Sequence, residues 1–182
     1  MDDVGRLWIG IGVCAAVILL MAFLTLCENA AVEFNDAKLK KMAEEDKDPK
    51  AIRLAALLGR TGRVVATNLI ARSIMIIAVS VVGAIYFYTP LSDGLHKLFD
   101  VYTQASYYII GICSFVIISC LLAIVICTFG ICIPKKLCIS GKVGEKFILN
   151  NCGVYKVFLA VFSPLAVVSG AVSAGVLRLF GV

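Results

Sequence analysis

The sequence has few charged residues and few of the side chains that catalysis or metal binding uses. Only 16% of the 182 residues are charged, and His96 is the single histidine. A soluble domain of this size needs more polar surface. A glycine-rich phosphate loop, a Cys-x-x-Cys pair and paired carboxylates in an apolar run are all missing from the sequence. These absences argue against a nucleotide-binding loop, a zinc site and an ordinary hydrolase, so an enzyme is not expected.

Hydrophobic residues make up 61% of the chain, and three long stretches carry no charge: residues 7–27, 73–91 and 101–133. About 20 apolar residues, at 1.5 Å each, cross a hydrocarbon core of roughly 30 Å, where only a helix or a closed barrel satisfies its own backbone. The sequence therefore predicts an all-α membrane protein with three transmembrane helices, at about 6–28, 65–90 and 103–133.

A fourth apolar run, residues 157–177, contains Pro164 and several small residues. Proline breaks or kinks a helix, and small residues four apart let helix backbones approach closely. Hydropathy alone counts this run as a fourth span. The alternative is a broken helical segment that enters only one leaflet.

The basic residues predict the orientation. The chain has 17 Lys+Arg against 12 Asp+Glu, a net charge of +5, and eight of the basic residues lie at positions 38–63, in the connector between the first and second stretches. The connector 92–100 contains only one basic residue, Lys97. The positive-inside bias therefore puts the N-terminus outside the cell membrane and the long basic connector in the cytoplasm. Mixed charges on this connector fit a solvated, lipid-facing surface, so a lipid bilayer is the expected partner and nucleic acid is not.

The basic connector has apolar residues at helical spacing on both sides of Pro49. This pattern predicts two short cytoplasmic amphipathic helices at about 35–63. The eight cysteines lie mostly in apolar runs, where cysteine is expected as a small packing residue rather than a metal or redox group.

Three segments, in order, resemble motifs of one family. The first runs from Ala22 to Ala31 and continues to Leu39, the second from Leu57 to Ile70, and the third is Phe-Gly-Ile-Cys-Ile-Pro-Lys at 129–135. They are similar to the F-S-G-S-E-T-A-L, L-L-x-x-P-D-R-L-L-S-T-I-L-I-G-N-N and F-G-E-x-x-P-K motifs of the CNNM/CorC magnesium transporters. The third motif includes Gly130, Pro134 and Lys135, which the resemblance places at a turn ending the third span.

The resemblance implies one domain over residues 1–182, with three spans and a broken juxtamembrane or re-entrant segment at about 139–181 that leaves the C-terminus cytoplasmic. It also implies a dimer, either with itself or with a related transporter. Family members usually continue into nucleotide-binding CBS domains, which this sequence does not contain.

Mg²⁺ is the ion that the resemblance implies, yet most of its ligands are replaced here. Matched by motif, the two serines become Thr25 and Cys27, the glycine becomes Ala71, the asparagine becomes Arg72, and the glutamate becomes Ile131. Mg²⁺ is a small, hard cation that needs oxygen ligands and some negative charge. The matched positions have lost the carboxylate and gained a positive charge, so the resemblance implies a degenerate site.

Arg72 lies near the start of the second span, and two interpretations are open. In one, it pairs with Glu28 at the end of the first span, with a further hydrogen bond from Asn68 one helical turn earlier. In the other, its guanidinium reaches out to lipid headgroups. The functional alternatives are a transporter that uses another ion or route, such as a monovalent ion at Thr25, Glu28 and Asn68, and a non-transporting regulatory or structural subunit.

Overall fold

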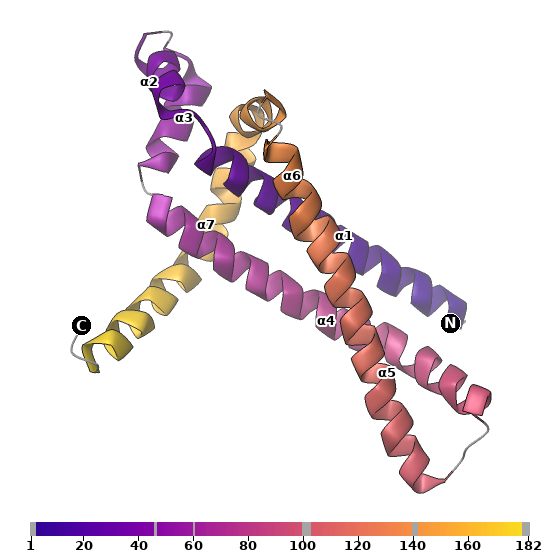
Figure 1. The fold of residues 1–182 in the computed structure, drawn as a ribbon. Helices are drawn as coiled ribbons and strands as arrows, with labels where there is room; N and C mark the ends of the chain where they lie inside the picture. The colour runs from indigo at the N-terminus through magenta and orange to yellow at the C-terminus, as the bar shows by residue number, and fades with distance from the viewer. Residues whose placement is uncertain (1–2, 46, 60, 100–102, 140–141, 180–182) are drawn as a thin grey trace. The chain divides into compact units, whose positions relative to one another are not determined.

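The computed structural model describes residues 3–45, 47–59, 61–99, 103–139 and 142–179, and all regular structure in these ranges is helical (Figure 1). The helices in chain order are α1 Asp3–Val32, α2 Asp36–Glu44, α3 Pro49–Leu58, α4 Thr61–Phe99, α5 Gln104–Val125, the π-helix η1 Ile126–Cys132, α6 Ile133–Ile139 and α7 Lys142–Leu179. The all-α expectation is therefore correct for the described residues.

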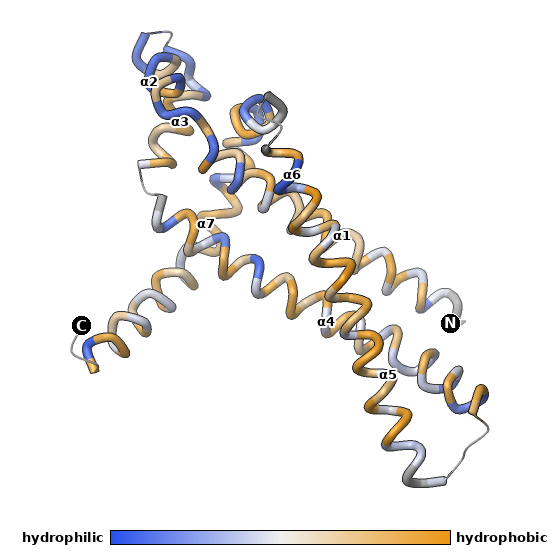
Figure 2. Tube along the Cα trace, viewed as in Figure 1, coloured by the Kyte–Doolittle hydropathy of each residue, from blue (hydrophilic) through white to orange (hydrophobic). Residues whose placement is uncertain are grey.

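Four helical stretches of the described chain are long and apolar enough to cross a membrane, where three spans were expected. They are Gly5–Val32, Gly62–Phe99, Ser106–Cys138 and Gly144–Leu179. Figure 2 shows that apolar residues dominate α1, α4 and α5, whereas polar residues cluster at α2 and at the start of α3. The chain is a multi-pass membrane protein.

The expectation of a broken segment at 139–181 was wrong, because α7 is one continuous helix through Pro164. Proline removes a single backbone hydrogen bond, to the carbonyl four residues earlier, and such a loss bends a helix without always ending it. The long apolar sequence on both sides favours helix, since a membrane leaves no other way to satisfy the backbone. Helix α4 also continues through Pro90 to Phe99, beyond the expected end at 90.

Two short helices occupy the connector between α1 and α4. The side chain of Asn35 caps α2, accepting hydrogen bonds from the backbone N–H groups of Ala37 and Lys38 at 3.0 and 3.1 Å. The side chain of Asp48 caps α3 in the same way, and Pro49 occupies its first turn, where a missing N–H costs nothing. Both helices lie within the 35–63 range predicted from the sequence.

The chain divides into two compact units. Unit 1 comprises residues 1–22 and 74–132, and unit 2 comprises residues 23–73 and 133–182. In unit 1, α1 approaches α4 at Gly10, where an added Cβ would lie 2.6 Å from Tyr86 Cβ. It approaches η1 at Gly130, where an added Cβ would lie 2.0 Å from Met21 Cε. Small residues therefore permit the close helix contacts of this unit.

Unit 2 contains the end of α1, the connector helices, the start of α4, and α6 and α7. Helix α3 packs on α2 and α7, and α6 packs on α7. The ring of Phe23 in α1 packs against Phe147 and Phe158 in α7, at centroid distances of 5.7 and 6.3 Å. Two polar contacts join the connector to α7: the ion pair of Lys38 with Glu145, and a 2.7 Å hydrogen bond from Lys50 to Asn150.

Candidate functional site

The last turns of α1 present a set of buried side chains in unit 2. Thr25 is 1% exposed and Cys27 is fully buried. The backbone carbonyl of Thr25 accepts a 2.8 Å hydrogen bond from Asn29 Nδ2. The hydroxyl Oγ1 of Thr25 is buried and has no hydrogen-bond partner among the described residues. This turn thus holds one buried oxygen whose hydrogen bonding is incomplete.

Helix α4 brings Arg72 to the same turns of α1. Arg72 Nη2 donates a 2.6 Å hydrogen bond to Glu28 Oε2, and the two side chains form an ion pair. Both are largely shielded, with 25% of the arginine side chain and 16% of the glutamate side chain exposed. A short hydrogen bond between two ionised groups is roughly twice as strong as a neutral one. The structure therefore joins α1 to α4 through this pair.

Asn68 does not contact Arg72 as expected. Its Nδ2 donates a 2.9 Å hydrogen bond to Tyr155 Oη in α7, and its Oδ1 is buried without a partner among the described residues. The bond to Tyr155 orients the amide toward α7, and neither polar atom of the Asn68 amide is hydrogen-bonded to the guanidinium. The predicted contact from Asn68 to Arg72 was therefore wrong.

Tyr155 is the functional-site residue that the sequence analysis missed. It is fully buried, and it lies within electrostatic range of Glu28, Arg72 and Cys27. The available signal was a tyrosine near the start of the last apolar run, because a buried Tyr hydroxyl needs a hydrogen-bond partner. Glu28, Asn68, Arg72 and Tyr155 are called the ion-pair cluster below. It joins α1, α4 and α7.

The other two matched positions, Ala71 and Ile131, belong to different units. Ala71 is buried beside Arg72 in α4. Ile131 belongs to η1 in unit 1, where it lines a cavity of about 290 Å³ whose wall residues include no carboxylate. The wall therefore offers no substitute for the carboxylate that the resemblance implies at position 131.

Gly130 and Pro134 were expected at a turn, but they lie in helices. Gly130 is part of η1, and Pro134 and Lys135 form the first turn of α6, which follows η1 directly. Proline has no N–H to donate, and the π-helix η1 directly before it already interrupts the α-helical hydrogen-bond pattern at this point. Pro134 is buried, and Lys135 is exposed.

Metal-binding groups of the usual kind are scarce. Within the described residues, no group of three or more His, Cys, Asp and Glu side chains is placed to hold a metal ion. Glu28 is the one carboxylate of the ion-pair cluster, and it is bound to Arg72. The arrangement joins α1, α4 and α7 through polar side-chain contacts.

The family comparison identifies the domain. The family described as the Cyclin M transmembrane N-terminal domain matches residues 12–182. A search of curated proteins found no match. The match covers the ion-pair cluster, Ile131 and all four candidate spans except the start of the first.

Proposed function

Since the chain belongs to the Cyclin M (CNNM) transmembrane-domain family, we propose that it is a membrane domain related to divalent-cation transporters in which Arg72 takes the place of Mg²⁺. One observation carries the proposal: Arg72 Nη2 lies 2.6 Å from Glu28 Oε2 in a shielded position between α1 and α4. Elsewhere in the family, by the resemblance stated above, the corresponding asparagine is an ion ligand.

Electrostatics favours the arginine over a divalent ion at this position. A guanidinium and a divalent cation about 4 Å apart repel each other by roughly 8 kcal/mol at an effective dielectric constant of 20. Glu28 is the carboxylate paired with Arg72, and because it already neutralises the arginine it does not offset that repulsion. A Mg²⁺ ion would have to break this pair and also lose its own water ligands, which it does reluctantly.

The proposed role is therefore a regulatory or structural subunit that does not itself transport Mg²⁺, and that dimerises with itself or with a complete relative. Eight basic residues at positions 38–63, against Lys97 as the one basic residue at 92–100, support a cytoplasmic position for α2 and α3 and an external N-terminus. Light scattering of the purified protein is expected to give the mass of two chains. Reporter fusions after residue 59 and after residue 99 are expected to report opposite sides of the membrane.

Thermal unfolding with Mg²⁺ tests the proposal. A ligand that binds only the folded protein stabilises it by about 2.7 kcal/mol at 100 times its dissociation constant. We expect no change in the Tm of the wild-type protein between zero and 20 mM Mg²⁺, with NaCl used to match ionic strength. A Mg²⁺-dependent rise in Tm that saturates would contradict the proposal.

A gain-of-binding variant makes the same test sharper. Arg72→Asn combined with Ile131→Glu restores the two motif residues, and this double variant is expected to gain a Mg²⁺-dependent rise in Tm. The charge-matched control is Arg178→Asn combined with Ile131→Glu, because Arg178 lies in the last turn of α7. Equal responses of both variants would show that general charge, and not the Arg72 position, governs the effect.

A second candidate is a monovalent-ion site, which two buried oxygens favour. Thr25 Oγ1 and Asn68 Oδ1 both lie in unit 2 without hydrogen-bond partners among the described residues. Buried polar atoms without a protein partner are rare unless a water molecule or an ion binds to them. Replacing N-methylglucamine by Na⁺ or K⁺ at constant ionic strength should then raise the Tm, and Thr25→Val should abolish the rise. No rise with either ion would reject this candidate.

A further inference from the structure

Unit 2 contains a cavity of about 440 Å³ that the proposed function does not use. Helices α3, α4 and α7 form its walls. The lining residues are Arg53, Ala56, Leu57, Arg63, Val64, Thr67, Lys156, Leu159, Ala160 and Ser163. The cavity therefore combines three cationic side chains with an apolar wall.

Within the described residues, no carboxylate neutralises the positive charge of this cavity. No carboxylate lines it, and Arg53, Arg63 and Lys156 have no ion pair within the described part of the chain. Arg63 Nη2 donates a 2.6 Å hydrogen bond to Ser163 Oγ, which still has its own hydrogen to donate. By contrast, Arg72 in the same unit is paired with a carboxylate. Three cations beside one cavity favour an anionic ligand.

The sequence gives the depth of the cavity in the membrane. Lys156 is the last charged residue before the charge-free run 157–177 of α7, and Arg63 directly follows the first residue of the candidate span in α4. Charged residues at the ends of apolar runs lie at the level of the lipid headgroups. Leu57, Val64 and Leu159 provide apolar surface beside the charges. The chemistry of this cavity thus changes from ionic to apolar, as a phospholipid does.

We propose that this cavity binds one anionic phospholipid, with its phosphate between Arg53, Arg63 and Lys156 and part of an acyl chain against the apolar wall. Arginine suits this role because its planar group can donate two parallel hydrogen bonds to phosphate oxygens. The hydroxyl of Ser163 supplies a further donor at the same place. A free phosphate ion would use the charges and leave the apolar wall in contact with water, so the lipid is the better ligand.

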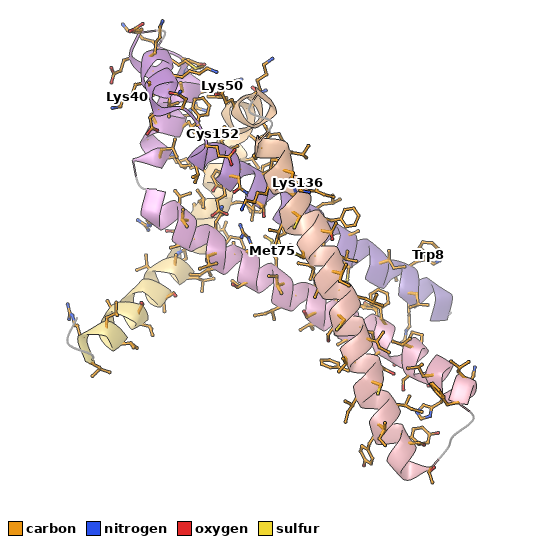
Figure 3. All side chains as sticks on the ribbon, viewed as in Figure 1. Trp8, Lys40, Lys50, Met75, Lys136 and Cys152 are labelled. Atoms are coloured by element: carbon orange, nitrogen blue, oxygen red, sulfur yellow. The ribbon has the colours of Figure 1, made fainter. Side chains whose placement is uncertain are left out.

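Native mass spectrometry tests the proposal on the full chain, purified from mixed vesicles of phosphatidylglycerol and phosphatidylcholine. We expect wild type to retain one phosphatidylglycerol in preference to phosphatidylcholine. The variant Arg53→Gln, Arg63→Gln, Lys156→Gln is expected to bind this lipid at least about tenfold more weakly, since basic side chains near a membrane surface each add to anionic-lipid binding. A control with equal charge loss replaces Lys40, Lys136 and Lys146 by Gln, and it should retain the lipid within about twofold. Lys40 and Lys136 are labelled in Figure 3, and none of the three lines the cavity.

A second variant separates a seated lipid from general attraction to a charged surface. Ala160→Phe keeps all three cations and fills part of the cavity, so it should also lose the retained lipid. Because it changes no charge, it remains informative if the triple variant fails to fold. Equal loss of lipid in the lysine control, retention by Ala160→Phe, or a Tm rise with inorganic phosphate equal to that with phosphatidylglycerol would each overturn the proposal.

Discussion

The two units of this protein are built from different kinds of contact. In unit 1, helices approach at glycines, with Gly10 against Tyr86, Gly83 against Leu122 and Gly130 against Met21. In unit 2, side-chain hydrogen bonds and ion pairs join elements distant in sequence, including Arg72 with Glu28 and Asn68 with Tyr155. One unit depends on close packing, and the other depends on polar pairing.

The difference follows from the solvent that each part meets. Lipid is as apolar as leucine, so helices within the bilayer associate through van der Waals packing, for which small residues allow the closest approach. Most of the basic residues lie in unit 2, where headgroups and water can accept charge. Arg72 and Glu28 differ from these basic residues because they are largely shielded from water. Burying either charge without the other would carry a large desolvation cost, so the two are found as a pair.

The largest effect is expected from removing one partner of this pair. Arg72→Met should lower the free energy of unfolding by about 3 kcal/mol, because Glu28 is left shielded and unpaired. Glu28→Gln alone should also be destabilising, and the double variant should cost about 2 kcal/mol less than the sum of the two. Titration with SDS in bicelles measures all four proteins. Additive losses would show that the pair is not coupled.

The second largest loss of stability is expected from disturbing the helix packing at Gly10. Gly10→Ala should destabilise the protein by about 2 kcal/mol, because the new methyl group would lie 2.6 Å from Tyr86 Cβ, which is fixed close to the backbone. Gly130→Ala should cost less, because its clash is with Met21 Cε, the end of a flexible side chain. Gly12→Ala is the matched control in α1, with no atom within 4 Å. The same unfolding titration ranks the three, and equal costs would contradict the packing account.

A smaller effect is expected from the hydroxyl of Tyr155. Tyr155→Phe should cost about 1.5 kcal/mol, because it leaves the buried Nδ2 of Asn68 without an acceptor. Tyr108→Phe serves as the control, since Tyr108 is 69% exposed. Thermal unfolding of both variants checks the difference. Identical Tm values for the two variants would remove Tyr155 from the ion-pair cluster.

The smallest effect is expected where α2 meets α7 through Lys38 and Glu145. Half of the lysine side chain is exposed, at 52%, so water and salt screen the pair. Lys38→Gln should cost about 0.5 kcal/mol, and the loss should vanish in 1 M NaCl. Unfolding at low and high salt measures it. A salt-independent loss would indicate that the contribution is one of packing.

Much of the fold follows from composition and spacing. The charge-free runs predict the helices of the first three spans, and Asn35, Asp48 and Pro49 mark the starts of the connector helices. The continuity of α7 could not be predicted from the sequence. Pro164 removes one backbone hydrogen bond, and whether the helix continues past it depends on the apolar surroundings. The π-helix η1 has no sequence rule that would place it at 126–132.

The candidate site also has a part that the sequence predicts and a part that it does not. Motif matching places Arg72 where the family resemblance implies an ion ligand. Glu28 carries a carboxylate at the end of the first span, so the sequence already indicates it as a partner for Arg72. The contribution of α7 was not visible in the sequence, because 87 residues separate Asn68 from Tyr155. Local spacing carries no information on which residues meet over such a separation.

By itself, the sequence determined that this protein is helical, that it lies in a membrane, and that Arg72 stands where the family resemblance implies an asparagine. Those properties depend on hydropathy, periodicity and residue identity, which are local. Only the tertiary structure decided that Arg72 binds Glu28, that Asn68 turns to Tyr155, and that Arg53, Arg63 and Lys156 share one cavity. These contacts depend on how helices far apart in the chain pack, and packing is a property of the whole fold.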